Sequence, residues 1–357
     1  MSFITPAHKP GIRGLRAASL TFMAAATTLA LAACGSSASP ETKGNDSFGE
    51  LSIQLSWVKN AEFAGEYFAD SQGYFADAGF DAVTLTAGPG ATEAVVLSGE
   101  ALVGLANPVS VAPVILEEEA PLKIIGTTYQ KNPFTILSLA DGGNILTPED
   151  LVGKKIGVQP GGNETLFDAL LKVNGIDADS VTKVPVEYDP SPLTNGEVDG
   201  FFAYVTNESI TLEDEGYTVA NLLFADNGLP FVAESFVVTQ DSIDKNREAL
   251  KAFLYADILG WKDAIADAAG GAKRAVDEYG KDLGLDLAKE TTQAELQNTQ
   301  LIVSDDTKEN GLFTMTDKLV NENITSLAAA GYDISADQLF DLTLLDEVYK
   351  EHPELLK

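Results

Sequence analysis

The feature that most constrains the fold is a strand-like run followed directly by a helix-like run. Apolar residues alternate at Leu51, Ile53 and Leu55, as is typical of a strand with one buried face. Residues 64–74 then have helix-forming composition, and Gly73 is placed to end that helix. Because a strand that leads into a helix is the building unit of α/β domains, we predict an α/β fold.

An aromatic residue and a polar residue stand where this first strand ends. Trp57 and Asn60 lie just beyond it, and in open α/β sheets ligands bind outside the carboxyl ends of the strands. Trp57 is therefore placed to form one wall of a binding site, with Asn60 as a polar contact. An interpretation of equal weight is that Trp57 is a partly buried core residue.

The residues around Trp57 also carry a family resemblance. The pattern W-x-x-N-A-E-x-x-G-x-Y, from Trp57 to Tyr67, is followed by G-Y-F and then by G-F-D. This succession resembles the start of the substrate-binding proteins of ABC importers in the NMT1/THI5-like group, which is similar to the binding proteins for thiamine-pyrimidine precursors, riboflavin, nitrate and alkanesulfonates. The resemblance runs from about Leu51 to about Gly260. It implies a type II periplasmic-binding-protein fold with two α/β lobes, a ligand cleft between them, and Tyr67 as a further candidate contact.

Three more candidate contacts follow strands in the first half of the chain. Strands are predicted over residues 81–86, 101–106 and 123–128. Gly88 allows a tight turn and a close approach of the backbone to a ligand. Asn107 is a good N-cap, so the helix start behind it offers free amides to a polar ligand group. Tyr129 is the second aromatic candidate for the cleft.

The resemblance implies that the chain crosses between the lobes twice. The runs FTILSL at 134–139 and ESFVVT at 234–239 are the predicted crossing strands. A folded part of roughly 300 residues also exceeds one comfortable core, which favours two lobes. The expected divisions are a leader at 1–33, a flexible tether at 34–49, a first lobe made of 50–138 and 235–357, and an inserted second lobe at 139–234.

The middle of the chain begins with the run TPEDLVGKKIGV at 147–158, which resembles a run common in periplasmic binding proteins. Asn163 follows a glycine-rich turn and is predicted to cap a helix that ends before Gly175. The turn lacks the G-x-x-x-x-G-K-[ST] arrangement, so nucleotide hydrolysis has no support. A short quasi-repeat, at 97–104 and 193–200, places a Gly-Glu turn before a strand in both expected lobes.

A second group of candidates surrounds Glu208. Asn207 and Glu208 lie near the carboxyl end of a predicted strand, and the pattern Tyr-x-x-Asn-Glu that starts at Tyr204 is similar to the thiamine-pyrimidine branch, where an acidic residue can bond an aminopyrimidine. A carboxylate accepts hydrogen bonds from an exocyclic amine, while aromatic walls stack on the ring for roughly 1–3 kcal/mol. Tyr188, after a strand at 184–186, is a weaker candidate. A surface helix start is an interpretation of Glu208 with equal weight.

The first residues indicate export. A basic stretch with Lys9, Arg13 and Arg16 precedes an apolar run at 17–33 that contains no acidic residue. The run ends in Leu-Ala-Ala-Cys, which resembles a lipobox, so we expect Cys34 to become a lipidated N-terminus on the extracytoplasmic face of the cell membrane. Cys34 is also the single cysteine, which excludes a disulfide within one chain.

Composition disfavours other classes of protein. The net charge of −31 repels nucleic acid and anionic lipid. His8 is expected to leave with the leader, which keeps only His352, and Cys34 is the expected lipid anchor. A zinc site of His and Cys, a histidine triad and a nucleophilic cysteine are therefore disfavoured. Pyrimidine synthases of the same family carry a W-x-P-N-x-x-H motif, but here Lys59 replaces the proline and Phe63 the histidine. A synthase is therefore disfavoured, and these substitutions also leave open whether the solute is the family's pyrimidine.

The predicted function is that of a solute receptor and not of an enzyme. We expect a monomeric, lipid-anchored binding protein without cofactor or metal, which delivers a small heteroaromatic solute to a membrane permease driven by a cytoplasmic ATPase. A thiamine-pyrimidine precursor is favoured over riboflavin. A sulfonate or nitrate is less favoured because no arginine stands near a candidate position. A structural or adhesive surface lipoprotein is the other alternative.

Overall fold

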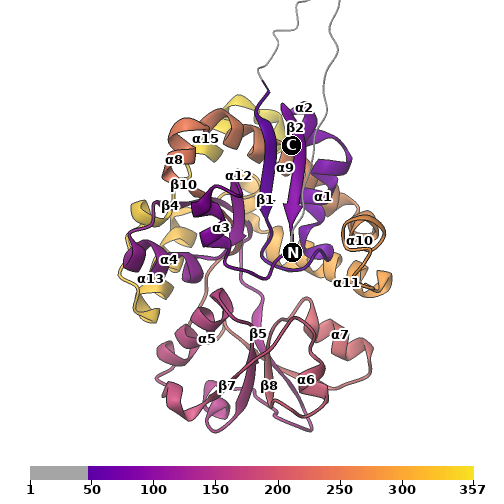
Figure 1. Cartoon of the computed structure of the whole chain (residues 1–357), viewed down its shortest axis with the longest axis vertical. Coiled ribbons are helices and arrows are strands. Elements are labelled where there is room, and N and C mark those ends of the chain that lie inside the picture. The colour runs from indigo at the N-terminus through magenta and orange to yellow at the C-terminus, as the bar shows by residue number, and fades with distance from the viewer. Residues whose placement is uncertain (1–46) are drawn as a thin grey trace, which may run out of the picture. The chain divides into compact units, whose positions relative to one another are not determined.

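The computed structural model describes residues 47–357, so the expected leader and Cys34 lie outside the described residues. These described residues belong to one compact unit. Within it, two five-stranded sheets carry the fold (Figure 1). In order across the first sheet, the strands are β2 (Phe80–Thr86), β1 (Gly49–Gln54), β3 (Val103–Ala106), β10 (Ala233–Thr239) and β4 (Leu122–Tyr129). Across the second they are β7 (Thr182–Pro185), β6 (Lys155–Val158), β8 (Gly200–Tyr204), β5 (Phe134–Leu139) and β9 (Val219–Leu223).

The two sheets have the same topology. In each, the first three strands are parallel, and the fourth runs antiparallel to both of its neighbours. The two copies of the quasi-repeat lead into β3 and β8, which occupy the same central position in their sheets. The sequence therefore placed this repeat correctly, and each sheet with its helices is called a lobe below.

The lobe boundaries need a correction. The predicted boundary at residue 139 assigns β5 to the first lobe, whereas β5 pairs with β8 and β9 of the second sheet. The boundary at residue 235 falls inside β10, which belongs to the first sheet. The chain therefore crosses between the sheets in the connections before these two strands, at residues 130–133 and 224–232, because each strand is hydrogen-bonded within one sheet only.

Helices flank both sheets. In Figure 1 the helices α5, α6 and α7 lie around the second sheet, while the C-terminal helices, coloured orange to yellow, gather at the first. The early helices of the first lobe are α1 (Ala64–Ser71), α2 (Tyr74–Asp77), α3 (Thr92–Ser98) and α4 (Pro108–Glu118). Those of the second lobe are α5 (Gly162–Val173), α6 (Ser191–Thr194) and α7 (Glu208–Asp214).

The C-terminal third, after β10, is helical. Its α-helices are α8 (Gln240–Lys245), α9 (Arg247–Ala266), α10 (Ala268–Arg274), α11 (Leu287–Gln297), α12 (Asp305–Asn310), α13 (Asp317–Ala330), α14 (Ala336–Leu339) and α15 (Thr343–Glu351). Short 3₁₀ or π turns occur at η1 (Ala61–Phe63), η2 (Pro148–Leu151), η3 (Ala178–Ser180), η4 (Ala275–Tyr279), η5 (Asn298–Ile302) and η6 (Pro353–Leu356).

Local sequence explains several element ends. Gly73 has a φ of 81° and separates α1 from α2, so the predicted helix at 64–74 is interrupted. Asn107 caps α4 as predicted, because its Oδ1 accepts from the amides of Val109 and Ser110. Asn163, by contrast, does not cap α5. The N-cap is Gly161, with a φ of 92°, and Asn163 lies in the first helical turn.

The core of the first lobe depends on a close contact between α1 and α9. A Cβ added to Gly65 of α1 would overlap the indole of Trp261, which belongs to α9 and is 1% exposed. Trp261 is therefore a core residue. This contact fixes α1, and with it the segment of residues 55–63 that carries Trp57 to the edge of the sheet.

Candidate functional site

A cavity lies where the two lobes meet. It has a volume of about 540 Å³ and is called the outer cavity. The first lobe contributes Trp57, Val58, Asn60, Leu283, Gly284, Leu285, Asp286, Lys289 and Glu290. The second contributes Tyr188, Asp189, Pro190, Ser191, Thr194, Asn207, Glu208, Thr211, Leu212, Asp214 and Glu215. Six of these residues are acidic and one, Lys289, is basic, so the cavity has a negative lining.

A smaller cavity of about 60 Å³ shares Trp57, Asn207 and Glu208 with the outer cavity and is called the inner pocket. Aromatic rings and carboxyl groups make up much of its wall. The lining residues are Ser56, Trp57, Ala106, Asn107, Phe134, Gln159, Asn163, Phe202, Ala203, Tyr204, Asn207, Glu208 and Glu234. Trp57, Asn107, Asn207 and Glu208 follow the ends of β1, β3 and β8, where the topology of an α/β sheet places ligands.

Glu234 joins the lobes at the inner pocket. Its Oε1 accepts a hydrogen bond of 2.9 Å from the Tyr204 hydroxyl of the second lobe, and its Oε2 accepts one of 2.7 Å from the Ser56 hydroxyl of the first. Glu234 is 3% exposed and has a positive φ of 47°, a conformation uncommon outside glycine. Burial raises its pKa above the ordinary value, while these two hydroxyl donors oppose the rise.

Glu208 opens α7 and receives a donor on each oxygen. The backbone amide of Tyr204 donates to Oε2 at 2.8 Å, and Nδ2 of Asn207 donates to Oε1 at 2.8 Å. Burial raises the pKa of Glu208 to about 7, although the Tyr204 amide and the charge of Lys289 lower it. A carboxyl group with a raised pKa therefore stands between the two cavities.

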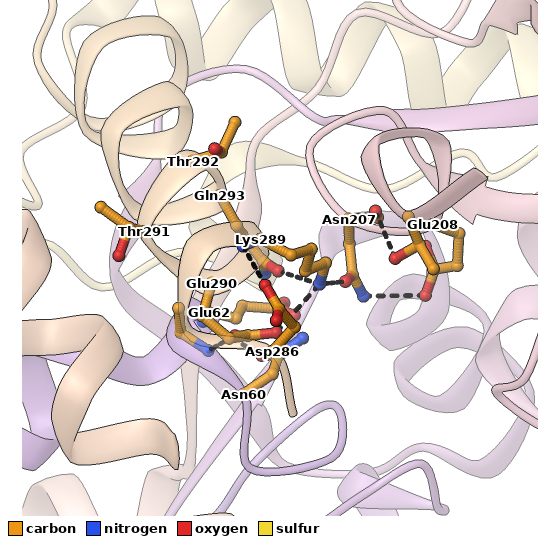
Figure 2. Close-up of polar contacts among 12 residues, drawn as sticks. Asn60, Glu62, Asn207, Glu208, Asp286, Lys289, Glu290, Thr291, Thr292 and Gln293 are labelled. Carbon is orange, nitrogen blue, oxygen red and sulfur yellow. Dashed lines mark hydrogen bonds and ion pairs between the residues drawn. The ribbon is translucent and has the colours of Figure 1, made fainter. Parts of the chain in front are cut away.

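Lys289 links this group to the first lobe. Figure 2 shows its ammonium among Asn207, Glu290 and Gln293. It donates to Asn207 Oδ1, to Glu290 Oε1 at 3.1 Å and to Gln293 Oε1 at 2.6 Å. Glu290 in turn accepts from the Ala61 amide at 2.6 Å. A continuous polar chain therefore runs from η1 through α11 to the start of α7.

Glu62 lies behind this chain, on η1. Asn60 caps η1 by accepting from the Glu62 amide at 3.0 Å. The carboxyl oxygens of Glu62 are buried and receive no hydrogen bond from the described residues. Burial, followed by the charge of Glu234, raises the pKa of Glu62 well above its usual range. Burial and the neighbouring Glu234 carboxyl therefore both favour the protonated form of Glu62.

The cavities bring together most of the residues that the sequence singled out. Those that line one or both cavities are Trp57, Asn60, Asn107, Asn163, Tyr188, Tyr204, Asn207 and Glu208. Trp57 and Tyr204 are half-buried, and Tyr188 is 44% exposed at the outer cavity. This gathering leaves their roles in ligand binding as predictions.

Three candidates lie outside both cavities. Tyr67 and Tyr129 are fully buried in the core, where Tyr67 stacks on Tyr279 and the Tyr129 hydroxyl donates to Gln297 at 2.9 Å. Gly88 packs against the backbone of Ser56, and its amide donates to the Trp57 carbonyl at 2.8 Å. The close approach expected at Gly88 is therefore made to the protein's own backbone, which supports the segment bearing Trp57.

Sequence reasoning missed four polar residues of this region. Glu62 and Glu234 stood in quoted motifs, and a carboxylate at the start of an apolar strand was a usable signal for Glu234. Lys289 and Glu290 carried no such signal, because they lie on a helix far away in sequence. Among residues 47–357, no group of three or more His, Cys, Asp or Glu side chains is arranged to hold a metal ion.

Known proteins resemble this chain in sequence and fold. The formylaminopyrimidine-binding protein of Halalkalibacterium halodurans is 25% identical over 59% of this chain and 65% of its own length. The riboflavin-binding protein RibY of Chloroflexus aurantiacus is 24% identical over 66% of this chain and 68% of its own length. Among solved structures, the periplasmic nitrate-binding protein of Synechocystis PCC 6803 covers 86% of this chain and 90% of itself at 12% identity, with a TM-score of 0.63.

These comparisons confirm the type II periplasmic-binding-protein fold, and both sequence relatives named above are described as binding proteins. None of the helices among residues 47–357 combines the length and the apolar character needed to cross a membrane. The model of the family described as NMT1/THI5 like matches residues 60–270, more than half of the chain. The chain therefore belongs to the NMT1/THI5-like family.

Proposed function

We propose that this protein is the extracytoplasmic solute receptor of an ABC importer and binds a small nitrogen heterocycle between its lobes. The observation that carries the proposal is the inner pocket, in which the carboxyl groups of Glu208 and Glu234 stand among the rings of Trp57, Phe134 and Tyr204. A flat ring with amine donors would stack on the aromatic side chains and donate hydrogen bonds to the carboxyl groups.

The chemistry of the pocket matches an aminated ring. An exocyclic amine donates to the Glu208 carboxylate, and Glu234 offers a second carboxyl group in the wall of the same pocket. Stacking against Trp57 adds roughly 1–3 kcal/mol, by analogy with nucleobases on aromatic side chains. Asn60 and Asn107 are proposed as further polar contacts, with Asn163 and Asn207 orienting the ring edge.

The negative charge of the outer cavity favours neutral or cationic solutes over anions. Its acidic residues are Asp189, Glu208, Asp214, Glu215, Asp286 and Glu290, against the single cation of Lys289. A negative lining raises the local concentration of neutral or cationic solutes relative to anions. We therefore place sulfonate and nitrate last, although proteins of the same fold bind them.

Two heterocycles remain in order of preference. A thiamine-pyrimidine precursor comes first, because it presents an aminopyrimidine edge to Glu208. Riboflavin comes second, and the size of the outer cavity, about 540 Å³, favours it, since a polyol chain attached to a ring needs more room than the inner pocket offers.

Transport would use the hinge between the lobes. We propose that the connections at residues 130–133 and 224–232 flex as the lobes close on the solute. The closed monomer would then dock on the transmembrane subunits of a permease with a cytoplasmic ATPase. Lipidation of Cys34 would hold the receptor on the extracytoplasmic face of the membrane.

Calorimetric titration tests the proposal with formylaminopyrimidine, riboflavin, ethanesulfonate and nitrate as separate solutes. We expect saturable one-to-one binding of one heterocycle and none of the anions at the same concentrations. Binding of an anion alone would overturn the assignment of solute class. Binding of none of the four would overturn the proposed heterocycle.

A further inference from the structure

Lys289 is the point at which α11 of the first lobe contacts the second lobe. Its side chain is 12% exposed, although it lines the outer cavity, and each of its hydrogen-bond acceptors is a side-chain oxygen. Glu290 and Gln293 belong to its own helix, whereas Asn207 belongs to the second lobe. The ammonium is therefore held in place by the first lobe and presented to the second (Figure 2).

The contact with Lys289 decides which way the Asn207 amide faces. Lys289 is a donor without acceptor capacity, so Asn207 must offer it the oxygen Oδ1. The amide nitrogen Nδ2 then faces Glu208 Oε1, to which it donates at 2.8 Å. With the Tyr204 amide on Oε2, Glu208 receives donors only, an arrangement that favours its ionised form.

We propose that Lys289 is a positioning residue that determines solute specificity. By holding the Asn207 amide in one orientation, Lys289 keeps Glu208 ionised and able to accept hydrogen bonds from a solute. Because Lys289 and Asn207 belong to different lobes, this contact exists only while the lobes are together. The inference rests on the proposed function and names the part of the site that selects solutes with amine donors. Without Lys289, the Asn207 amide is free to turn, and Glu208 loses the nearest positive charge.

The charges around Glu208 give the direction of the effect. Lys289 and Glu290 face it from α11, Glu62 faces it from η1, and Glu234 of β10 lies on the far side of Tyr204. Burial raises the pKa of Glu208 to about 7, Lys289 lowers that pKa, and Glu290 raises it. Removal of Lys289 leaves Glu208 with acidic neighbours only, so its pKa must rise.

The effect is measurable without any solute. The pH titration of the Glu208 carboxyl carbon is followed by ¹³C NMR in protein labelled at glutamate, and the signal is assigned by its loss in Glu208→Gln. We expect a midpoint near pH 7 in the wild type and a rise of about one unit or more in Lys289→Met. Lys289→Arg should restore most of the wild-type midpoint. Lys183→Met serves as the matched control. Lys183 forms an ion pair with Asp168 at a distance of 2.9 Å, and neither residue lines a cavity.

An unchanged midpoint in Lys289→Met would overturn the inference. The second readout is the affinity for formylaminopyrimidine between pH 6 and 9. In Lys289→Met we expect a loss of about fivefold near pH 7, which recovers above pH 8 as Glu208 ionises. If Lys289→Met lost the same affinity at every pH, Lys289 would have a merely structural role, and this result would also overturn the inference. If the NMR midpoint moves but the wild type binds no heterocycle, the proposed function fails while the effect of Lys289 on Glu208 stands.

Discussion

Two pairs of buried acidic residues differ in what surrounds them. Glu208 and Glu234, called the cleft carboxyls, line the inner pocket and accept four hydrogen bonds between them. Glu66 of α1 and Asp257 of α9, called the core carboxyls, are equally buried but line neither cavity. Oε2 of Glu66 and both carboxyl oxygens of Asp257 have no hydrogen-bond partner among the described residues.

The difference shows that burial alone does not mark a functional acid. Burial raises the pKa in both pairs, to about 8 for Glu66 and to about 7 for Glu208. The cleft carboxyls accept hydrogen bonds on all four oxygens next to an open cavity, whereas the core carboxyls lie away from both cavities. Burial favours the protonated form of the core carboxyls, whereas the position of the cleft carboxyls suits the proposed contact with a solute.

The largest effect is expected from Glu208→Gln. The substitution removes the charge and replaces one acceptor oxygen with a donor, so we expect the affinity for the heterocycle to fall about 100-fold, or roughly 2.7 kcal/mol, at pH 8. Calorimetric titration measures the loss. Glu213→Gln, on the exposed side of the same helix, is the matched control and should bind like the wild type. Equal affinity of both variants would remove Glu208 from the site.

Glu66→Gln should affect stability and not binding. Folding raises the pKa of Glu66 from 4.5 to about 8, so the folded state holds its proton more tightly than the unfolded state. The contribution of Glu66 to stability is then fully present below pH 4.5 and is lost as the pH rises from 4.5 to 8. We expect the variant to gain about 1–2 kcal/mol in the free energy of unfolding at pH 8 and to lose part of this pH dependence.

Urea denaturation at pH 5 and pH 8 measures this gain. Glu309→Gln, at an exposed position of α12, controls for the change in net charge. A loss of solute affinity in Glu66→Gln, with unfolding unchanged, would erase the distinction between cleft and core carboxyls.

The smallest effect is expected from Tyr204→Phe. It removes one donor from Glu234 and leaves the ring in place, which makes a cleft carboxyl more like a core one. We expect a stability loss of about 1 kcal/mol at pH 8 and a severalfold loss of solute affinity, both smaller at pH 5, where Glu234 is less ionised. Urea denaturation at pH 5 and pH 8 measures the stability loss, and calorimetric titration at the same pH values measures the affinity loss. Identical values for variant and wild type would show that the contact between the lobes at Glu234 carries no energy.

The sequence predicted the fold through local signals. Alternating apolar residues located β1, the N-cap Asn107 located α4, and the quasi-repeat placed β3 and β8 at equivalent positions. The lobe boundaries were less accurate, because nothing in the run FTILSL shows which sheet will accept its hydrogen bonds. Pairing of β5 with β8 and β9 is a property of the assembled sheet.

Residues that line the two cavities were predicted where they follow strand ends and missed where they depend on distant packing. Trp57, Asn207 and Glu208 were found by that rule. Tyr129 also stands at a strand end, but its side chain points into the core, where its hydroxyl donates to Gln297. The strand-end rule does not predict whether a side chain faces the core or the cavity. Lys289 reaches Asn207 from 82 residues away in sequence, so only the folded chain shows the contact.

Intrinsic fluorescence tests most directly whether an aromatic solute lies against Trp57. The chain has two tryptophans, of which Trp57 lines both cavities and Trp261 is buried in the core. Titration of the wild type with the heterocycle that binds in calorimetry should quench the emission saturably, and Trp57→Phe should abolish that response while Trp261 still emits. Undiminished quenching in Trp57→Phe, or calorimetric binding with no change in wild-type emission, would contradict the placement of the solute between the lobes at Trp57.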